Sequence, residues 1–357
     1  MPSLAKLYSA EIEGIDALLI EVEVDLHSGI NAFNIICLAD KALIEAKERV
    51  NSALKNSGLK PPNRENRKLT INLAPGDIKK TGTQYDLAIA IGYALATKQV
   101  SNFNAEKILF IGELALDGTL RQVNGALNFA DCAKKNNKSI IILPKENAAE
   151  ASSIKNIEVI PASSLSEVIK YLEKKIEIKY DIPKNILDQP IYEIDFSHIK
   201  GHAHAKRALI IAAAGGHNIL MVGAPGSGKS YLAHSLVSIL PKLENSEQLE
   251  ITKIYSSLGL FKNTLISTRP FRNPHHSAST ISVIGGGSNP KPGEISLANR
   301  GVLFLDELPE FRRDLLESLR EPLENREVRI SRAKKSLSFP ANFTLIAAMN
   351  PCPCGYF

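Results

Sequence analysis

Eight consecutive residues, Gly223–Ser230, read GAPGSGKS and constrain the fold of this chain more than any other stretch. They satisfy the pattern GxxxxGK[ST], in which glycines let backbone N–H groups turn inward around a phosphate. The apolar run 219–222 predicts a buried strand before the loop, and residues 231–240 predict a helix after it. A strand, this loop and a helix, in that order, predict an α/β domain with a phosphate-binding loop.

The last two residues of the loop carry side chains suited to a nucleotide. Lys229 is expected to place its ammonium against the β- and γ-phosphates, and the Ser230 hydroxyl is a hard-oxygen ligand for Mg²⁺. The alternative is a chance glycine-rich turn, which the order of strand, loop, Lys–Ser pair and helix disfavours. The residues predicted to bind ATP are Gly223, Ala224, Pro225, Gly226, Ser227, Gly228, Lys229 and Ser230.

A second apolar run, 301–305, ends in the carboxylates Asp306 and Glu307, about 75 residues after the loop. Two adjacent carboxylates at the end of a buried strand need a cation, because an unpaired buried charge is costly. We expect Asp306 to hold Mg²⁺, usually through water, and Glu307 to polarise the attacking water as a general base. Two solvated residues at a strand end are the alternative.

A third apolar run, 344–349, ends in Asn350. In nucleotide-driven motors a polar residue at this strand tip senses the γ-phosphate and helps to orient the water, so Asn350 is a third candidate catalytic residue beside Glu307 and Lys229. An ordinary turn-forming asparagine before Pro351 is the alternative.

The 357-residue length predicts two domains, since single cores rarely grow past roughly 250–300 residues. The first half alternates strand and helix signals, and we expect an α/β domain over 1–175, a linker over 176–197 and the ATP-binding core over 198–357. Strands are predicted around 20–26, 69–73, 108–116, 140–143 and 157–160, and helices around 43–54, 86–96, 125–134 and 164–172.

Charge divides unevenly along the chain. Residues 1–197 carry a formal net charge of −2, and residues 198–357 carry +7. A positive ATP-binding half fits a polyanionic partner, although part of the charge only neutralises nucleotide phosphates.

Further motifs surround the acidic strand. The stretch 269–276 reads RPFRNPHH, 284–287 reads IGGG, 291–298 reads KPGEISLA, and 349–356 reads MNPCPCGY. Together with the phosphate loop they resemble the YifB/ComM family, the magnesium chelatase-like AAA+ proteins of bacteria. The resemblance covers nearly the whole chain. It implies a P-loop AAA+ α/β/α core and an ATP-driven ring, typically a hexamer, with ComM members acting as DNA helicases that drive branch migration during natural transformation.

The first half is similar to the C-terminal domain of Lon protease, a ribosomal-S5-like fold, through APGDIKKTG at 74–82 and GELALDGTLR at 112–121. A working Lon site needs a serine nucleophile and a lysine that takes its proton. This chain has 83–85, Thr-Gln-Tyr, at the serine position and Leu127 at the lysine position. We therefore expect no protease activity, and interpret the domain as a platform for assembly or DNA.

A basic hairpin is predicted between Pro322 and Pro340, where related motors carry a β-hairpin that points into the ring pore. We expect sequence-independent, salt-sensitive contact with a DNA backbone. A solvated basic hairpin or charges at a subunit interface are the alternatives. The candidate DNA contacts are Arg329, Arg332, Lys334 and Lys335.

Four cysteines do not make a disulfide scaffold, and no apolar run is long enough to span a membrane, which favours a cytoplasmic protein. Cys352 and Cys354 supply two of the ligands that a zinc site would need, and His275–His276 lack a further ligand at metal spacing. The histidines are therefore interpreted as polar loop residues.

Members of the YifB/ComM family extend further at the C-terminus, with a segment that carries an arginine finger and with a helical lid. The resemblance therefore implies that this chain is C-terminally truncated and that its turnover is impaired. An arginine finger accounts for about 10³–10⁵ in rate. The competing hypotheses are a metal-chelatase motor subunit and an inactive remnant that only binds nucleotide.

Overall fold

The computed structural model describes residues 4–30, 32–62, 67–180, 192–261, 264–287, 290–331 and 336–351. Contacts divide the chain into two compact units: residues 1–184 with 259–264 form unit 1, and residues 185–258 with 265–357 form unit 2. The boundary at 184/185 lies inside the expected linker, 176–197, of which residues 181–191 lie outside the described part. In the described part of the chain, no helix has both the length and the apolarity to cross a bilayer.

Unit 1 combines a four-stranded sheet, ordered β1-β2-β5-β3, with a parallel three-stranded sheet, β11-β10-β7. Its strands are β1 (Ala5–Glu13), β2 (Asp16–Ser28), β3 (Ala32–Ile36), β4 (Leu38–Ala39), β5 (Arg67–Ala74), β6 (Lys79–Lys80), β7 (Ile108–Phe110), β8 (Glu113–Leu114), β9 (Leu120–Arg121), β10 (Ile140–Pro144) and β11 (Glu158–Ala162). Its α-helices are α1 (Lys41–Ile44), α2 (Ala46–Asn56), α3 (Asp86–Ala96), α4 (Ala126–Lys135), α5 (Ala148–Ala151) and α6 (Leu165–Leu172).

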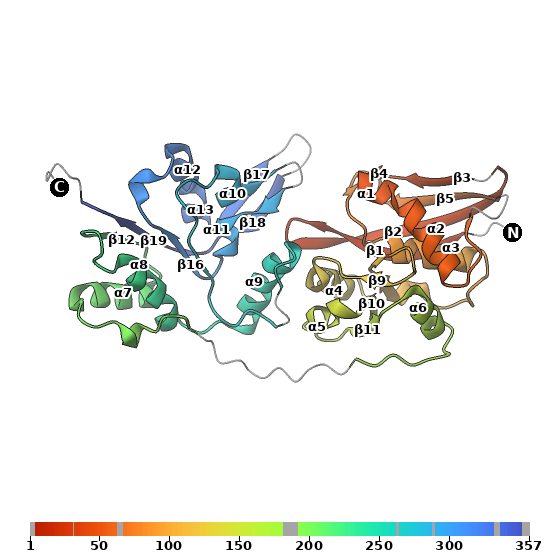
Figure 1. Cartoon of the computed structure of the whole chain (residues 1–357), viewed down its shortest axis with the longest axis horizontal. Coiled ribbons are helices and arrows are strands. Elements are labelled where there is room, and N and C mark those ends of the chain that lie inside the picture. The colour runs from red at the N-terminus through yellow and green to blue at the C-terminus, as the bar shows by residue number, and fades with distance from the viewer. Residues whose placement is uncertain are drawn as a thin grey trace. The chain divides into compact units, whose positions relative to one another are not determined.

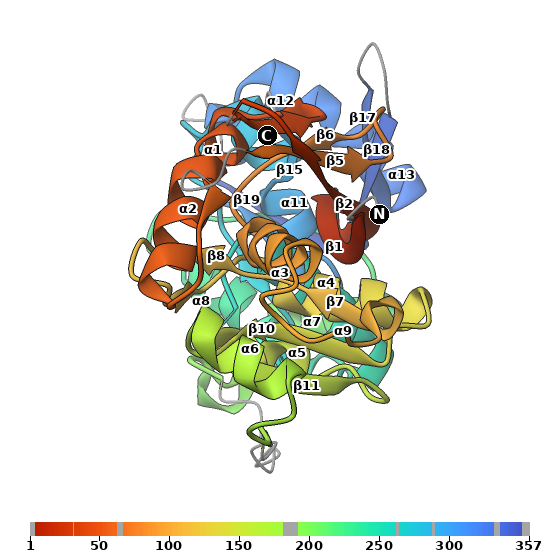
Figure 2. The same cartoon turned by 90° about the vertical axis from the view of Figure 1, so that its right-hand side faces the viewer.

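The core of unit 1 forms around helix α3, which packs against β1 and β2, with α2 beside it (Figure 2). The alternation predicted for β2 is confirmed, since Ile20, Val22 and Val24 are fully buried while the glutamates between them are not. Strand β1, which the periodicity did not predict, pairs along all of its length with β2. The expected strand 108–116 is interrupted, because Ile111 and Gly112 separate β7 from β8.

Unit 2 contains a four-stranded sheet, β12-β19-β16-β13, in which every neighbouring pair is parallel (Figure 1). Its strands are β12 (Ile219–Val222), β13 (Phe271–Arg272), β14 (Gly285–Gly286), β15 (Lys291–Pro292), β16 (Val302–Leu305), β17 (Glu327–Ser331), β18 (Ser336–Pro340) and β19 (Thr344–Met349). Its α-helices are α7 (Ala203–Gly215), α8 (Lys229–Ser235), α9 (Asn245–Ser257), α10 (Thr280–Ile284), α11 (Glu294–Leu297), α12 (Arg313–Ser318) and α13 (Arg320–Asn325).

The α/β character predicted for both halves is confirmed, and so are the strands expected at 219–222, around 301–305 and at 344–349. Strand β16 is buried along its whole length, as the continuous apolar run predicts for a parallel strand. The expectation that the strand before the phosphate loop is buried is wrong. Leu220 and Val222, which point to the same face of β12, are exposed, while Ile219 and Met221 on its other face are half-buried.

Asp86, at the start of α3, is fully buried and bonded to Arg49, whose Nε lies 2.6 Å from Oδ2 and whose Nη2 lies 3.0 Å from Oδ1. Burial raises the pKa of the Asp86 carboxyl to about 6, and the Arg49 guanidinium opposes that rise. We predict that Arg49→Ala lowers the free energy of unfolding of unit 1 by about 3–5 kcal/mol at pH 8, because it leaves a buried carboxylate without its cation. Hydrogen exchange of the α3 amides measures this.

The loss should shrink at pH 5. Without Arg49 the pKa of the carboxyl rises further, the folded variant then holds a proton that the unfolded chain has released, and stability is regained as pH falls. Arg121→Ala is the control, because the Arg121 side chain is exposed and its ion pair with Glu113, 3.5 Å long, should contribute less than about 1 kcal/mol. Equal losses in both variants, or equal losses at both pH values, would contradict this account.

Candidate functional site

The predicted site residues come from three strands that end at one edge of the unit 2 sheet. In the parallel register, Val222 of β12 lies beside Met349 of β19, and Leu305 of β16 lies beside Ala347. The residues directly after these strands, Gly223, Asp306 and Asn350, are therefore brought to the same edge. Parallel α/β sheets bind ligands at the carboxyl ends of their strands, so this edge is the expected place for a site.

The loop after β12 turns through two glycines that need a left-handed backbone. Gly226 has φ 75° and Gly228 has φ 82°, a region that side-chain-bearing residues rarely adopt. The loop is fastened to the sheet by Gly223, whose N–H donates to the Met349 carbonyl at 3.3 Å. Helix α8 begins directly at Lys229, so its first-turn N–H groups have no carbonyl one turn earlier in the helix.

Lys229 lies at the centre of this arrangement. Its Nζ donates to the carbonyls of Gly223 at 2.7 Å and Ala224 at 3.0 Å, and to Oδ1 of Asn350 at 3.1 Å. Within the described ranges no carboxylate forms an ion pair with it. An ammonium that contacts only neutral oxygens is free to take an anionic partner, and a phosphate suits it.

Ser230 and Asp306 form a pair of oxygen ligands. The Ser230 hydroxyl donates to Oδ2 of Asp306 at 2.7 Å, and the other carboxylate oxygen accepts from the Glu307 N–H at 2.9 Å. A hydroxyl and a carboxylate, both open to solvent, are the hard donors that Mg²⁺ prefers when phosphates and water complete its shell. The residues present therefore fit a magnesium–nucleotide complex.

Glu307 has an unusual backbone and a neighbour that the sequence interpretation missed. Its φ is 53°, in the left-handed region, where a non-glycine residue is strained. Nδ1 of His276 lies 3.3 Å from Oε2 of Glu307, and the imidazole rings of His275 and His276 lie 4.1 Å apart. The pairing of β13 with β16 explains this contact, because His276 follows β13 and Glu307 follows β16 at the same edge of the sheet.

His276 thus contacts Glu307 at the acidic strand end, and His275 packs against His276. The interpretation of His276 as an ordinary polar loop residue therefore omits its contact with a candidate catalytic residue. No group of three or more metal-binding side chains occurs in the described parts of the chain. Cys352 and Cys354, the other candidate metal ligands, lie outside those parts.

The predicted basic hairpin is present as β17 paired antiparallel with β18. Arg329 lies exposed on β17, and its Nε donates to Oε1 of Glu327 at 2.6 Å, so a neighbouring carboxylate offsets its charge. The other candidate DNA contacts, Arg332, Lys334 and Lys335, lie outside the described residues.

Unit 1 holds a buried polar cluster where the Lon resemblance would place a nucleophile. Glu11 accepts hydrogen bonds from the Thr81 hydroxyl at 2.7 Å, the Gln84 amide at 3.2 Å and the Tyr85 hydroxyl at 2.5 Å. Burial raises the pKa of the Glu11 carboxyl. Leu127, at the expected lysine position, is fully buried on α4.

Comparison with known proteins places these features in a family context. The sequence family described as magnesium chelatase, subunit ChlI, matches residues 195–357, and a second one, described as subunit ChlI of Mg-chelatase, matches residues 22–147. The competence protein ComM of Haemophilus influenzae is 44% identical over 363 residues, which cover 99% of this chain and 70% of that protein.

Two further relatives are similar over different lengths. The protein YifB of Escherichia coli is 41% identical over 99% of this chain and 69% of its own length. The magnesium-chelatase 38 kDa subunit of Rhodobacter capsulatus is 28% identical over 44% of this chain and 50% of its own length.

We predict that Lys229→Ala weakens the binding of a fluorescent ATP analogue at least about tenfold, because the loss of one charge-assisted contact is worth about 1.5–3 kcal/mol. Fluorescence titration in the presence of Mg²⁺ measures the dissociation constant. Lys242→Ala is the matched control, since Lys242 is an exposed lysine of the same unit outside the phosphate loop. If Lys229→Ala binds the analogue as tightly as the control does, the loop is not the nucleotide site.

Proposed function

Because this chain belongs to the YifB/ComM family of magnesium chelatase-like proteins, we propose that it is an AAA+ motor that uses Mg-ATP to move along DNA. The observation that carries the proposal is the convergence of Lys229, Ser230, Asp306 and Asn350 at one sheet edge. These residues follow three neighbouring strands, Lys229 and Ser230 at the start of α8 and the other two directly after β16 and β19. They supply, respectively, an ammonium, a hydroxyl, a carboxylate and an amide.

Each residue has a proposed role in ATP hydrolysis. The loop Gly223–Ser230 cradles the phosphates, with Lys229 on the β- and γ-phosphates. Ser230 and Asp306 hold Mg²⁺, which neutralises phosphate charge when bound. Glu307 takes the proton of the attacking water, and Asn350 orients that water from the tip of β19.

His276 adds a positioning role to this proposal. With its ring nitrogen 3.3 Å from Glu307, it holds the general base beside β13. The strained φ of Glu307 is of the kind that concentrates at active sites, which supports its role there.

DNA is the proposed partner, bound without regard to sequence. Support comes from the net charge of +7 in residues 198–357 and from the hairpin β17–β18, between whose strands the sequence carries Arg332, Lys334 and Lys335. One relative is named a competence protein, which is consistent with DNA translocation or branch migration in recombination and natural transformation. A hexameric ring, as expected for the family, would surround the DNA with six such hairpins.

Unit 1 is proposed to be a Lon-like domain that serves assembly or DNA contact and not peptide hydrolysis. The position expected for the lysine of a Lon dyad is occupied by Leu127, which is buried. Glu11 engages the side chains of Thr81, Gln84 and Tyr85 in internal hydrogen bonds.

A second candidate function is the motor subunit of a metal chelatase. The matches to magnesium chelatase subunit ChlI and to the 38 kDa chelatase subunit favour it. It is distinguished by its partner, because a chelatase motor acts on a tetrapyrrole-binding subunit, whereas a DNA motor is stimulated by DNA.

We predict that single-stranded DNA raises the ATP hydrolysis rate of this chain at least about fivefold at low salt, a typical size for coupling between two sites. Phosphate release with and without a thymidine oligonucleotide measures it. Glu307→Gln should lower turnover about 10²–10⁴-fold while the chain still binds nucleotide, since it removes the general base.

The combined variant Arg332→Ala, Lys334→Ala and Lys335→Ala should lose the stimulation, because it removes three phosphate contacts. A matched control removes the same charge from unit 1 with Lys145→Ala, Lys155→Ala and Lys170→Ala, all exposed lysines. The proposal that DNA binds the hairpin and stimulates the motor would be ruled out by either of two results. One is a hydrolysis rate that DNA does not change, and the other is equal stimulation of the two combined variants.

A further inference from the structure

The hairpin β17–β18 is joined to the strands of the candidate site at their opposite ends. Its two strands meet at the base through Ala341, whose N–H donates to the Arg326 carbonyl at 2.8 Å. The next residue, Asn342, accepts from the Arg300 N–H at 2.6 Å, and Thr344 donates to the Gly301 carbonyl at 2.9 Å. The base of the hairpin is therefore bonded to the residues that lead into β16.

Asn299 is the buried centre of this junction. Its side chain is fully buried, its Oδ1 accepts from the Asn342 N–H at 2.9 Å, and its Nδ2 donates to Oε1 of Glu250 at 3.1 Å. Glu250 lies on α9, so one amide side chain connects the hairpin base to that helix. A buried amide that makes both bonds is costly to disrupt, because each lost partner leaves a polar group unpaired.

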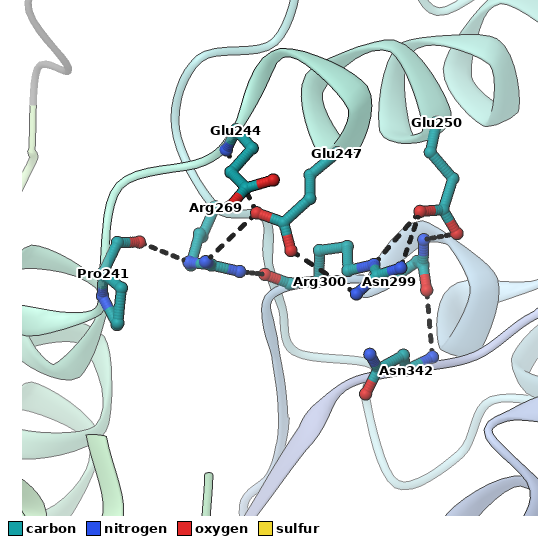
Figure 3. Close-up of polar contacts among 8 residues, drawn as sticks. All are labelled: Pro241, Glu244, Glu247, Glu250, Arg269, Asn299, Arg300 and Asn342. Carbon is teal, nitrogen blue, oxygen red and sulfur yellow. Dashed lines mark hydrogen bonds and ion pairs between the residues drawn. The ribbon is translucent and has the colours of Figure 1, made fainter. Parts of the chain in front are cut away.

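Two arginines and two glutamates form linked ion pairs beside Asn299 (Figure 3). Arg300 donates from Nε to Oε2 of Glu250 at 3.1 Å and from Nη1 to Oε1 of Glu247 at 3.4 Å. Arg269 donates from Nη1 to the Arg300 carbonyl at 2.6 Å and from Nη2 to Oε2 of Glu247 at 3.5 Å. We refer to Glu247, Glu250, Arg269, Asn299, Arg300 and Asn342 as the clamp.

Arg300 of the clamp and Arg326 at the base of the hairpin both have a strained backbone, and an open pocket lies beside them. Arg300 has φ 61° and Arg326 has φ 57°, both in the left-handed region that costs a non-glycine residue of order 1–3 kcal/mol. A polar surface pocket of about 280 Å³, lined in part by Arg269, Arg326 and Asn342, adjoins the hairpin base. The base of the hairpin therefore has room to move, and Arg300 and Arg326 are the positions where the backbone dihedral angles would change most readily.

We infer that Asn299 and Arg300 are positioning residues that couple the hairpin to the nucleotide site. The two strands that begin beside the clamp are β16, which Asp306 and Glu307 directly follow, and β19, which Asn350 directly follows. Both are short parallel strands, paired from Val302 beside Thr344 to Leu305 beside Ala347, and roughly 13–20 Å long. A displacement of the hairpin base moves both strands along their axes and shifts the residues at their far ends.

Coupling of this kind acts in both directions, because linkage between two sites is reciprocal. Nucleotide binding at one end of β16 and β19 changes the hairpin base at the other end, and a nucleic-acid strand on the hairpin changes nucleotide affinity. The inference rests on the proposed nucleotide site but does not require that DNA be the strand that binds.

Hydrogen exchange of the hairpin peptide 336–342, with and without Mg²⁺ and a non-hydrolysable ATP analogue, tests the inference. In the unmodified chain we expect saturating nucleotide to change the exchange rate of this peptide at least about fivefold. Asn299→Ala should abolish that response, with saturation of each variant verified by the fluorescent analogue.

Restoration of the bond distinguishes coupling from general loosening. Asn299→Asp alone places a second carboxylate against Glu250 and should abolish the response. Adding Glu250→Gln returns a donor–acceptor pair of the same total charge and should restore most of it. Asn147→Ala is the matched control, because Asn147 is an equally buried amide in unit 1, bonded to Val123 at 2.9 and 2.8 Å.

The outcomes separate this inference from the proposed function. If nucleotide does not bind, the proposed site fails and the inference fails with it. If nucleotide binds but the exchange of 336–342 is unchanged in the unmodified chain, the site stands and the coupling is wrong. A response that survives in Asn299→Ala, or that is lost equally in Asn147→Ala, also overturns the assignment of Asn299.

Discussion

The parallel pairing of β12, β19 and β16 is the constraint on which the rest of unit 2 depends. Because all three strands run in the same direction, the phosphate loop, the acidic pair and Asn350 meet at one edge although they lie far apart in the sequence. The same pairing brings the first residues of β16 and β19 together at the other edge, beside the hairpin base. One sheet thus connects a candidate chemical site to a candidate binding element.

The two ends of the sheet are stabilised in different ways. At the carboxyl end, Lys229 contacts neutral oxygens and Ser230 bonds to Asp306, an arrangement that accepts phosphate and Mg²⁺. At the amino end, two arginines and two glutamates neutralise each other around the buried Asn299. The carboxyl end of the sheet has polar groups free to bind a ligand, whereas the polar groups at the amino end bond to one another. This difference suits a motor, because a shift caused by ligand binding at the carboxyl end can reach the amino end while the bonds there keep the fold intact.

Much of the fold and of the nucleotide site could be predicted from the sequence, because their signals are local. The period-2 alternation of β2 and the apolar run of β16 reflect burial directly, and the loop motif fixes Lys229 and Ser230. What could not be predicted depends on partners distant in the chain. The exposure of Leu220 and Val222 depends on what covers one face of β12, and the contacts of His276 with Glu307 and of Asn299 with Asn342 depend on the tertiary fold.

The central claim is that Asp306 and Ser230 hold the divalent cation of a nucleotide complex, and Mn²⁺ in place of Mg²⁺ tests it most directly. Electron paramagnetic resonance with ATP present should show one Mn²⁺ bound per chain with hyperfine coupling to phosphorus. Asp306→Ala should remove that signal, while Asp314→Ala, which replaces an exposed aspartate of α12, should keep it. A phosphorus-coupled Mn²⁺ signal that persists unchanged in Asp306→Ala would contradict the account.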